Sequence, residues 1–109
     1  MVTEHSYLVK VTQAGVAMPP VPAGVARSLR VVSVTNADTT TNHILTVEVE
    51  RGGAVFEVVS AFPVIAEQGA QSAAIGPSVL EAGDILRFLA SQDDHLTVWV
   101  SYHDRKVAA

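Results

Sequence analysis

Segments rich in β-branched residues, separated by turn residues at intervals of roughly 8–12 residues, recur along this sequence. The pattern is clearest over residues 44–51, where Leu45, Val47 and Val49 alternate with polar and charged side chains. Such alternation is typical of a strand with one face against a core and the other facing water. The Gly-Gly pair at 52–53 predicts a two-residue hairpin into a second strand. Helical periodicity is absent, so the chain is predicted to be all-β.

The remaining segments complete an antiparallel β-sandwich or jelly roll of about seven to eight short strands. The segment 27–35 is apolar on both faces in its middle, which predicts a central strand covered on both sides. An Ala-Gly-Asp turn at 82–84 precedes the strand expected at 85–90, and the segment 96–102 is expected to return beside that strand as a hairpin. Other strands are expected at 6–12, 54–62, 73–75 and up to Leu80.

The chain is expected to form one domain with three parts. Residues 1–25 hold a first strand and a connector with three prolines in four positions, which favours a stiff, extended backbone. Two alternatives remain open for the first strand: the edge of its own sheet, or an extended arm that pairs with a neighbouring copy. Residues 26–104 form the predicted sandwich, and residues 105–109 form a tail that is expected to be frayed.

Composition argues against several classes of function. With 109 residues, the chain is long enough for one domain with its own core. A formal net charge of −4 and seven scattered basic residues argue against a nucleic-acid partner, which needs clustered cations. No apolar run reaches the roughly 18 residues of a membrane-spanning helix, and the first residues lack the pattern of a signal peptide. The absence of cysteine excludes disulfides and fits synthesis in a cytoplasm.

The sequence shows no motif for catalysis, for a cofactor or for a metal ion. Ser-His-Asp spacing, a phosphate-binding loop and a dinucleotide fingerprint are missing, which predicts a protein that is not an enzyme and has no cofactor. His95 and His103 stand about 26 Å apart along an extended strand, so one ion cannot bind both. His5 and His43 have no ligand partner at diagnostic spacing, and the turn at Asp93-Asp94 lacks the alternating ligands of a calcium loop. No catalytic or metal-binding residue is therefore assigned.

Trp99 has the clearest potential for a contact with another molecule. The alternation of its strand places Trp99 opposite the apolar face, so its ring is expected to face outward unless a loop or the opposing sheet covers it. An outward tryptophan can bind another protein or stack on a sugar ring. The residues expected at protein contacts are Tyr7, Val9, Pro19, Pro20, Val21 and Trp99.

From about residue 30 to residue 103 the chain resembles the small virion structural proteins of tailed bacteriophages. The segments that carry the resemblance are an Asn-rich turn (Val34-Thr35-Asn36-Ala37-Asp38), an alternating strand with a Gly-Gly hairpin (Ile44 to Gly53), a middle strand with a polar loop (Phe56 to Gln71) and the turn Val79-Leu80-Glu81-Ala82-Gly83-Asp84. An apolar strand, a polar turn and a Val-rich terminal strand follow. The first 25 residues lie outside this pattern.

The resemblance implies a β-sandwich without catalytic residues that assembles on a phage particle, as a capsid decoration, neck or tail component. It implies two kinds of partner: further copies of the chain, in a trimer or ring, and other virion proteins such as the major capsid, neck or tail proteins. The location would be the virion, after synthesis in the host cytoplasm. The alternative is a carbohydrate-binding module or a fibre-associated receptor-binding domain that uses Trp99 as a stacking platform.

Overall fold

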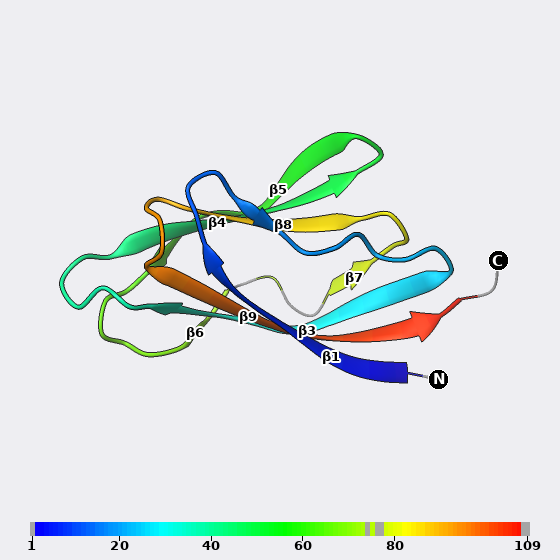
Figure 1. The fold of residues 1–109 in the computed structure, drawn as a ribbon, viewed down its shortest axis with the longest axis horizontal. Coiled ribbons are helices and arrows are strands. Elements are labelled where there is room, and N and C mark those ends of the chain that lie inside the picture. The colour runs from blue at the N-terminus through cyan, green and yellow to red at the C-terminus, as the bar shows by residue number, and fades with distance from the viewer. Residues whose placement is uncertain (1, 74, 76–77, 108–109) are drawn as a thin grey trace.

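Two antiparallel β-sheets pack face to face in the computed structural model, which describes residues 2–73, 75 and 78–107 (Figure 1). These residues form nine strands and no helix, which confirms the predicted all-β sandwich. The strands outnumber the expected seven to eight because two of them contain only two residues. They are β1 (Val2–Val11), β2 (Val16–Ala17), β3 (Val25–Asn36), β4 (His43–Arg51), β5 (Ala54–Val64), β6 (Gln71–Ser72), β7 (Ser78–Leu80), β8 (Ile85–Ala90) and β9 (Leu96–Lys106).

The N-terminal part of the chain contributes one edge strand to each sheet, β1 to the first and β2 to the second. The first sheet has the order β1-β9-β3, with β6 and β7 both pairing with the far edge of β3, and the second has the order β2-β8-β4-β5. β1 and β2 therefore lie along one side of the sandwich, and β5 and β7 lie along the opposite side. The short strand expected at 73–75 is replaced by β6, and residue 74 lies outside the described residues. The described part of the chain contains no helix able to cross a membrane.

The β4–β5 hairpin forms where the glycine pair predicts it. Arg51 and Ala54 face each other in the register, and Gly52 and Gly53 both have positive φ angles, of 61° and 81°. Two consecutive positive φ angles define the type I′ turn, whose twist matches that of the flanking strands. This hairpin extends away from the body of the sandwich (Figure 1).

The expected hairpin between residues 85–90 and 96–102 is wrong. β8 pairs with β2 and β4, whereas β9 pairs with β1 and β3, so the turn between them crosses from one sheet to the other. A turn signal shows where the chain reverses, but it does not show whether the next strand pairs with the previous one. Each strand has one buried face, with Phe88 on β8 and Val98 on β9 both fully buried. Opposite sheets allow these two apolar faces to meet across the core.

The N-terminal strand is the edge strand of the first sheet and does not extend as an arm. β1 pairs with β9 from Val2↔Arg105 to Val11↔Leu96, and the Val11 side chain is fully buried. The connector is also part of the fold, because Met18 and Val21 are both 2% exposed. The expected separation of residues 1–25 from the sandwich is therefore wrong, because its apolar side chains complete the core. Of the two alternatives for the first strand, the structure shows the edge of its own sheet.

The last strand also extends further than expected. β9 ends at Lys106, so the first two residues of the expected frayed tail belong to a strand. Arg105 pairs with Ala26, and the N–H of Val107 donates a hydrogen bond to the carbonyl of Gly24 at 3.0 Å. Pairing on both sides, with β1 and with β3, continues the ladder through charged residues that composition alone marks as a tail.

Alternating residues of the long strands supply the core. The alternation expected in β4 is present, since Leu45 and Val47 are fully buried. β3 differs from the expected doubly covered strand, because Val31 is 48% exposed next to a shift in register between Leu29 and Val31. The largest fully buried side chains are Phe88, Met18, Leu29, Leu45, Leu86 and Leu96.

Candidate interaction surfaces

The N-terminal half of β5 is an unpaired, apolar sheet edge. Within the described residues β5 pairs with β4 alone, which leaves the backbone groups along its other side without a strand partner. Val55, Phe56 and Val58 are 48%, 54% and 45% exposed, and Glu57 is the sole charged residue of the strand. In the C-terminal half of β5, Pro63 has no backbone N–H to donate, which hinders pairing with another chain there. An edge of this kind is a template for pairing with another chain.

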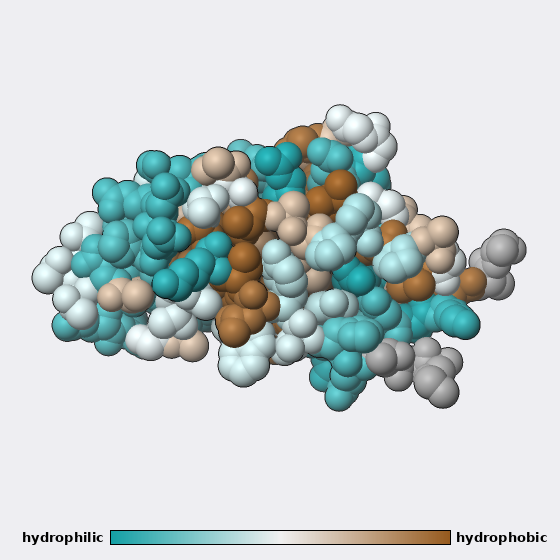
Figure 2. Space-filling model, in the orientation of Figure 1, coloured by the Kyte–Doolittle hydropathy of each residue, from teal (hydrophilic) through white to brown (hydrophobic). Residues whose placement is uncertain are grey.

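An apolar groove lies beside this edge, where the β4–β5 hairpin extends over β7. Its volume is about 340 Å³, and its lining includes Val49, Phe56 and Val58 from the hairpin and Val79 and Leu80 from β7. Figure 2 shows hydrophobic residues among hydrophilic ones in the region of the β4–β5 hairpin. Residues 54–58 and this groove together are called the β5 edge below. It is an apolar surface on which a second strand gains both backbone hydrogen bonds and side-chain burial.

A second apolar surface lies on the outer face of the first sheet. Trp99 is 56% exposed, as the alternation of its strand predicts, and no loop or sheet among the described residues covers it. Leu8 is directly opposite Trp99 in the β1–β9 register and is 64% exposed. Val31 is exposed on the neighbouring strand β3. These three side chains are called the Trp99 face below.

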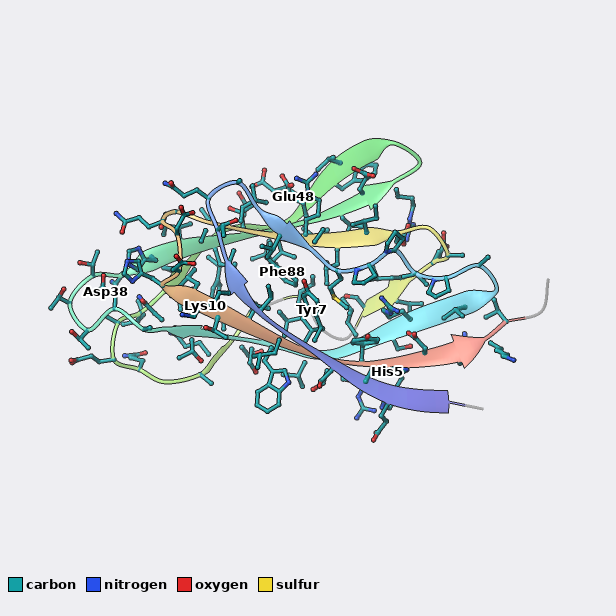
Figure 3. All side chains as sticks on the ribbon, in the orientation of Figure 1. His5, Tyr7, Lys10, Asp38, Glu48 and Phe88 are labelled. Carbon is teal, nitrogen blue, oxygen red and sulfur yellow. The ribbon has the colours of Figure 1, made fainter. Side chains whose placement is uncertain are left out.

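The six residues expected at protein contacts fall into two groups. Tyr7 and Val9 pack against the core, Val21 is buried within it, and Figure 3 shows Tyr7 between the two sheets. The hydroxyl of Tyr7 donates a hydrogen bond to the carbonyl of Ala17 at 3.2 Å. These three assignments assumed an arm outside the sandwich. The pairing of β1 with β9 turns Tyr7 and Val9 inward, and backbone hydrogen bonds with Gly83 and Asp84 hold Val21 in the core. Pro19, Pro20 and Trp99 are exposed and remain available for contacts.

A cluster of three potential metal ligands lies at one end of the sandwich, where Figure 3 labels Asp38. Asp38 and His43 come from the β3–β4 loop and the start of β4, and His95 comes from the turn between β8 and β9. One nitrogen or oxygen atom from each residue lies within 4.8 Å of those of the others. The rings of His43 and His95 stack with centroids 4.7 Å apart and planes 4° from parallel. The sequence did not indicate this cluster, because His95 is far from the other two residues along the chain.

The Asp38 carboxylate is held in a fixed orientation. Its Oδ1 accepts hydrogen bonds from the backbone N–H groups of Thr40 and Thr41 at 3.0 and 3.2 Å, and its Oδ2 lies 3.0 Å from His43 Nε2. The bond from Thr40, followed by the one from His43, holds the pKa of Asp38 well below its usual range. An ionised carboxylate can only accept, so the proton of the Asp38–His43 bond lies on His43 Nε2.

The turn at residues 81–84, one of the segments that carry the resemblance, has a structural role. Asp84 is 1% exposed and accepts hydrogen bonds from Arg51 Nε and Nη2, at 2.9 and 2.6 Å, and from the Glu81 N–H at 2.8 Å. The Arg51 bonds lower the pKa of Asp84. Backbone hydrogen bonds from Val21 to Asp84 and from Gly83 to Val21 also fasten the connector to this turn. The motif therefore stabilises the fold and offers no reactive group.

No protein-family model and no curated protein matches this sequence. A solved structure with a similar fold is described as "Bacillus endospore appendages form a novel family of disulfide-linked pili". The two chains are 11% identical with a TM-score of 0.59, and the match covers 100% of this chain and 88% of the other. At this identity the likeness shows a shared fold. The disulfides named in that description have no counterpart here, because this chain has no cysteine.

Proposed function

We propose that this protein is a non-enzymatic structural subunit that assembles with further copies of itself through the β5 edge. The observation that carries the proposal is the exposed apolar strand over residues 54–58, which has a free backbone edge and borders an apolar groove. Exposed apolar edge strands promote uncontrolled association unless a specific partner covers them. This edge is therefore expected to have a specific partner.

One structural likeness, together with the resemblance expected from the sequence, supports a self-assembling subunit. The sequence resembles small virion proteins of tailed phages, and the fold is similar to that of a protein whose description refers to pili. Both classes build large assemblies from repeated subunits. Because this chain has no cysteine, its subunits associate without disulfides, through strand pairing and apolar burial.

The geometry of the sheets favours a head-to-tail contact between copies. β5 and β1 are edge strands on opposite sides of the sandwich. Pairing β5 of one copy with β1 of the next leaves one free edge at each end, so the contact repeats. A rotation that closes gives the ring expected for a virion component, and one that does not close gives a filament. We place the subunit in a virion, as the sequence resemblance implies.

Oligomeric state tests the proposal directly. The purified chain is expected to form a concentration-dependent oligomer in sedimentation velocity, and Phe56→Ser is expected to shift it toward monomer. Val31→Ser is the matched control, because Val31 is similarly exposed but lies on the Trp99 face. A wild-type chain that stays monomeric, or equal weakening by both substitutions, would contradict the β5 contact. Negative-stain electron microscopy then separates a closed ring, which supports the virion, from an open filament, which supports an appendage.

Carbohydrate binding is the second candidate, and the exposed Trp99 ring favours it. A flat aromatic ring can stack on the apolar face of a sugar. Its cross-strand neighbours are Leu8 on one side and Ser33 on the other, so the ring has no aromatic companion in the register. This arrangement suits a protein contact better than a sugar site. We therefore rank carbohydrate binding second.

A further inference from the structure

We propose that Asp38, His43 and His95 bind a divalent transition-metal cation such as Zn²⁺. Two imidazoles and a carboxylate form the ligand set that zinc and its neighbours in the first transition series accept. The donor atoms already lie within 4.8 Å of one another. The site lies at the end of the sandwich formed by the β3–β4 loop and the β8–β9 turn, so it does not depend on the assembly proposed above.

Two of the three donors are already in position for a metal ion. On a tetrahedral zinc ion with bonds of about 2.1 Å, neighbouring donor atoms lie about 3.4 Å apart. Asp38 Oδ2 and His43 Nε2 are 3.0 Å apart. The ion takes the place of the hydrogen on His43 Nε2, and the neutral ring then carries its one hydrogen on Nδ1. Thr40 and Thr41 keep the carboxylate oriented through its other oxygen.

The third donor, His95, has to rotate. Its ring is nearly parallel to that of His43, and lone pairs in two parallel planes cannot point at one ion. His95 is partly exposed in a turn, so its ring can leave the stack without disturbing the core. Metal binding therefore replaces a ring stack by two coordinate bonds. The fourth coordination position is left for water, as in zinc sites with three protein ligands.

The bound ion would join two connections that both cross between the sheets. The β3–β4 loop passes from the first sheet to the second, and the β8–β9 turn passes back. One backbone hydrogen bond, from Ala37 N–H to the carbonyl of His95 at 2.8 Å, already links them. A metal ion adds a second link at the same place. The expected result is a higher melting temperature of the full chain in the presence of the ion.

Titration of ZnCl₂ into tag-free, EDTA-stripped protein by isothermal calorimetry tests the site. We expect saturable binding of one ion per chain and displaced imidazole signals of His43 and His95 in NMR spectra. His95→Phe keeps a ring for the stack but removes the donor, and it is expected to weaken binding by roughly a hundredfold or more. His43→Gln keeps a side-chain N–H for Asp38 and is expected to give the same loss.

His103→Ala is the matched control for binding to surface histidines. His103 pairs with Glu4 at 2.9 Å on the outer face of the first sheet, away from the cluster, and its loss is expected to leave zinc binding unchanged. Failure of the wild-type chain to bind zinc would overturn the proposal. Binding that survives His95→Phe, or that is lost in His103→Ala, would overturn it as well. Circular dichroism of each variant establishes that a loss of binding is not a loss of fold.

Discussion

Replacing Asp104 with asparagine is expected to destabilise the sandwich by about 2 kcal/mol. Its two carboxylate oxygens accept hydrogen bonds from Arg27 Nε and Nη2 at 2.8 and 3.0 Å, and the Asp104 and Arg27 side chains are 18% and 7% exposed. Hydrogen bonds to charged groups contribute roughly 1.5–3 kcal/mol each, and removing one partner of a fully buried pair costs about 3–5 kcal/mol. Asparagine keeps one acceptor oxygen, and Asp104 retains some contact with water, so the expected cost lies below the second range.

The dependence on pH gives this prediction a second test. The hydrogen bonds from Arg27 lower the pKa of Asp104 below its usual value of about 3.9. The pair therefore contributes its full stability above the unfolded pKa, and this contribution is lost as the pH falls through the lowered pKa of the folded state. The difference between wild type and Asp104→Asn is expected to be constant from pH 6 to pH 7 and to shrink below about pH 3.

Urea denaturation at each pH measures the free energy of unfolding, and thermal denaturation followed by circular dichroism measures the melting temperature. At pH 7 the melting temperature of Asp104→Asn is expected to fall by about 10 °C for a domain of this size. Glu4→Gln is the control, because it removes an 82% exposed carboxylate that pairs with His103 on the same strand β9. An exposed pair contributes at most about 1 kcal/mol. A loss below 0.5 kcal/mol in Asp104→Asn, which is roughly the effect of an ordinary surface substitution, would refute the reasoning.

Two further predictions concern the N-terminal strand and Trp99. Deleting residues 1–11 is expected to prevent cooperative folding, because it exposes the edge of β9 and removes buried Val11; a sigmoidal denaturation curve for the truncated chain would contradict this. Trp99→Ala is expected to change the free energy of unfolding by less than about 0.5 kcal/mol, as measured by chemical denaturation, because the ring is exposed. A glycan array with the wild-type chain is expected to give no signal; binding that Trp99→Ala abolishes would instead favour the carbohydrate alternative.

The sequence predicted the exposure of Trp99, but it did not predict which residues near the N-terminus are exposed. Trp99 was expected to face outward from the alternation of one strand, and it does. Tyr7 and Val21 were expected at contacts because they precede the sandwich in the sequence, yet both face the core. Nothing local to β1 shows which strand it pairs with. That partner, β9, lies at the other end of the chain.

Local pattern in this sequence was sufficient for the fold class, for the β4–β5 hairpin and for the buried faces of β4 and β9. These features depend on contacts between near neighbours: alternation with a period of two, and the positive φ angles that Gly52 and Gly53 adopt easily. The order of the strands was decided by tertiary structure, because β8 and β9 bury their apolar faces equally well as a hairpin or across the core. The Asp38–His43–His95 cluster was decided in the same way. His95 reaches the β3–β4 loop because the two sheets pack together, and no spacing of residues along the chain indicates this.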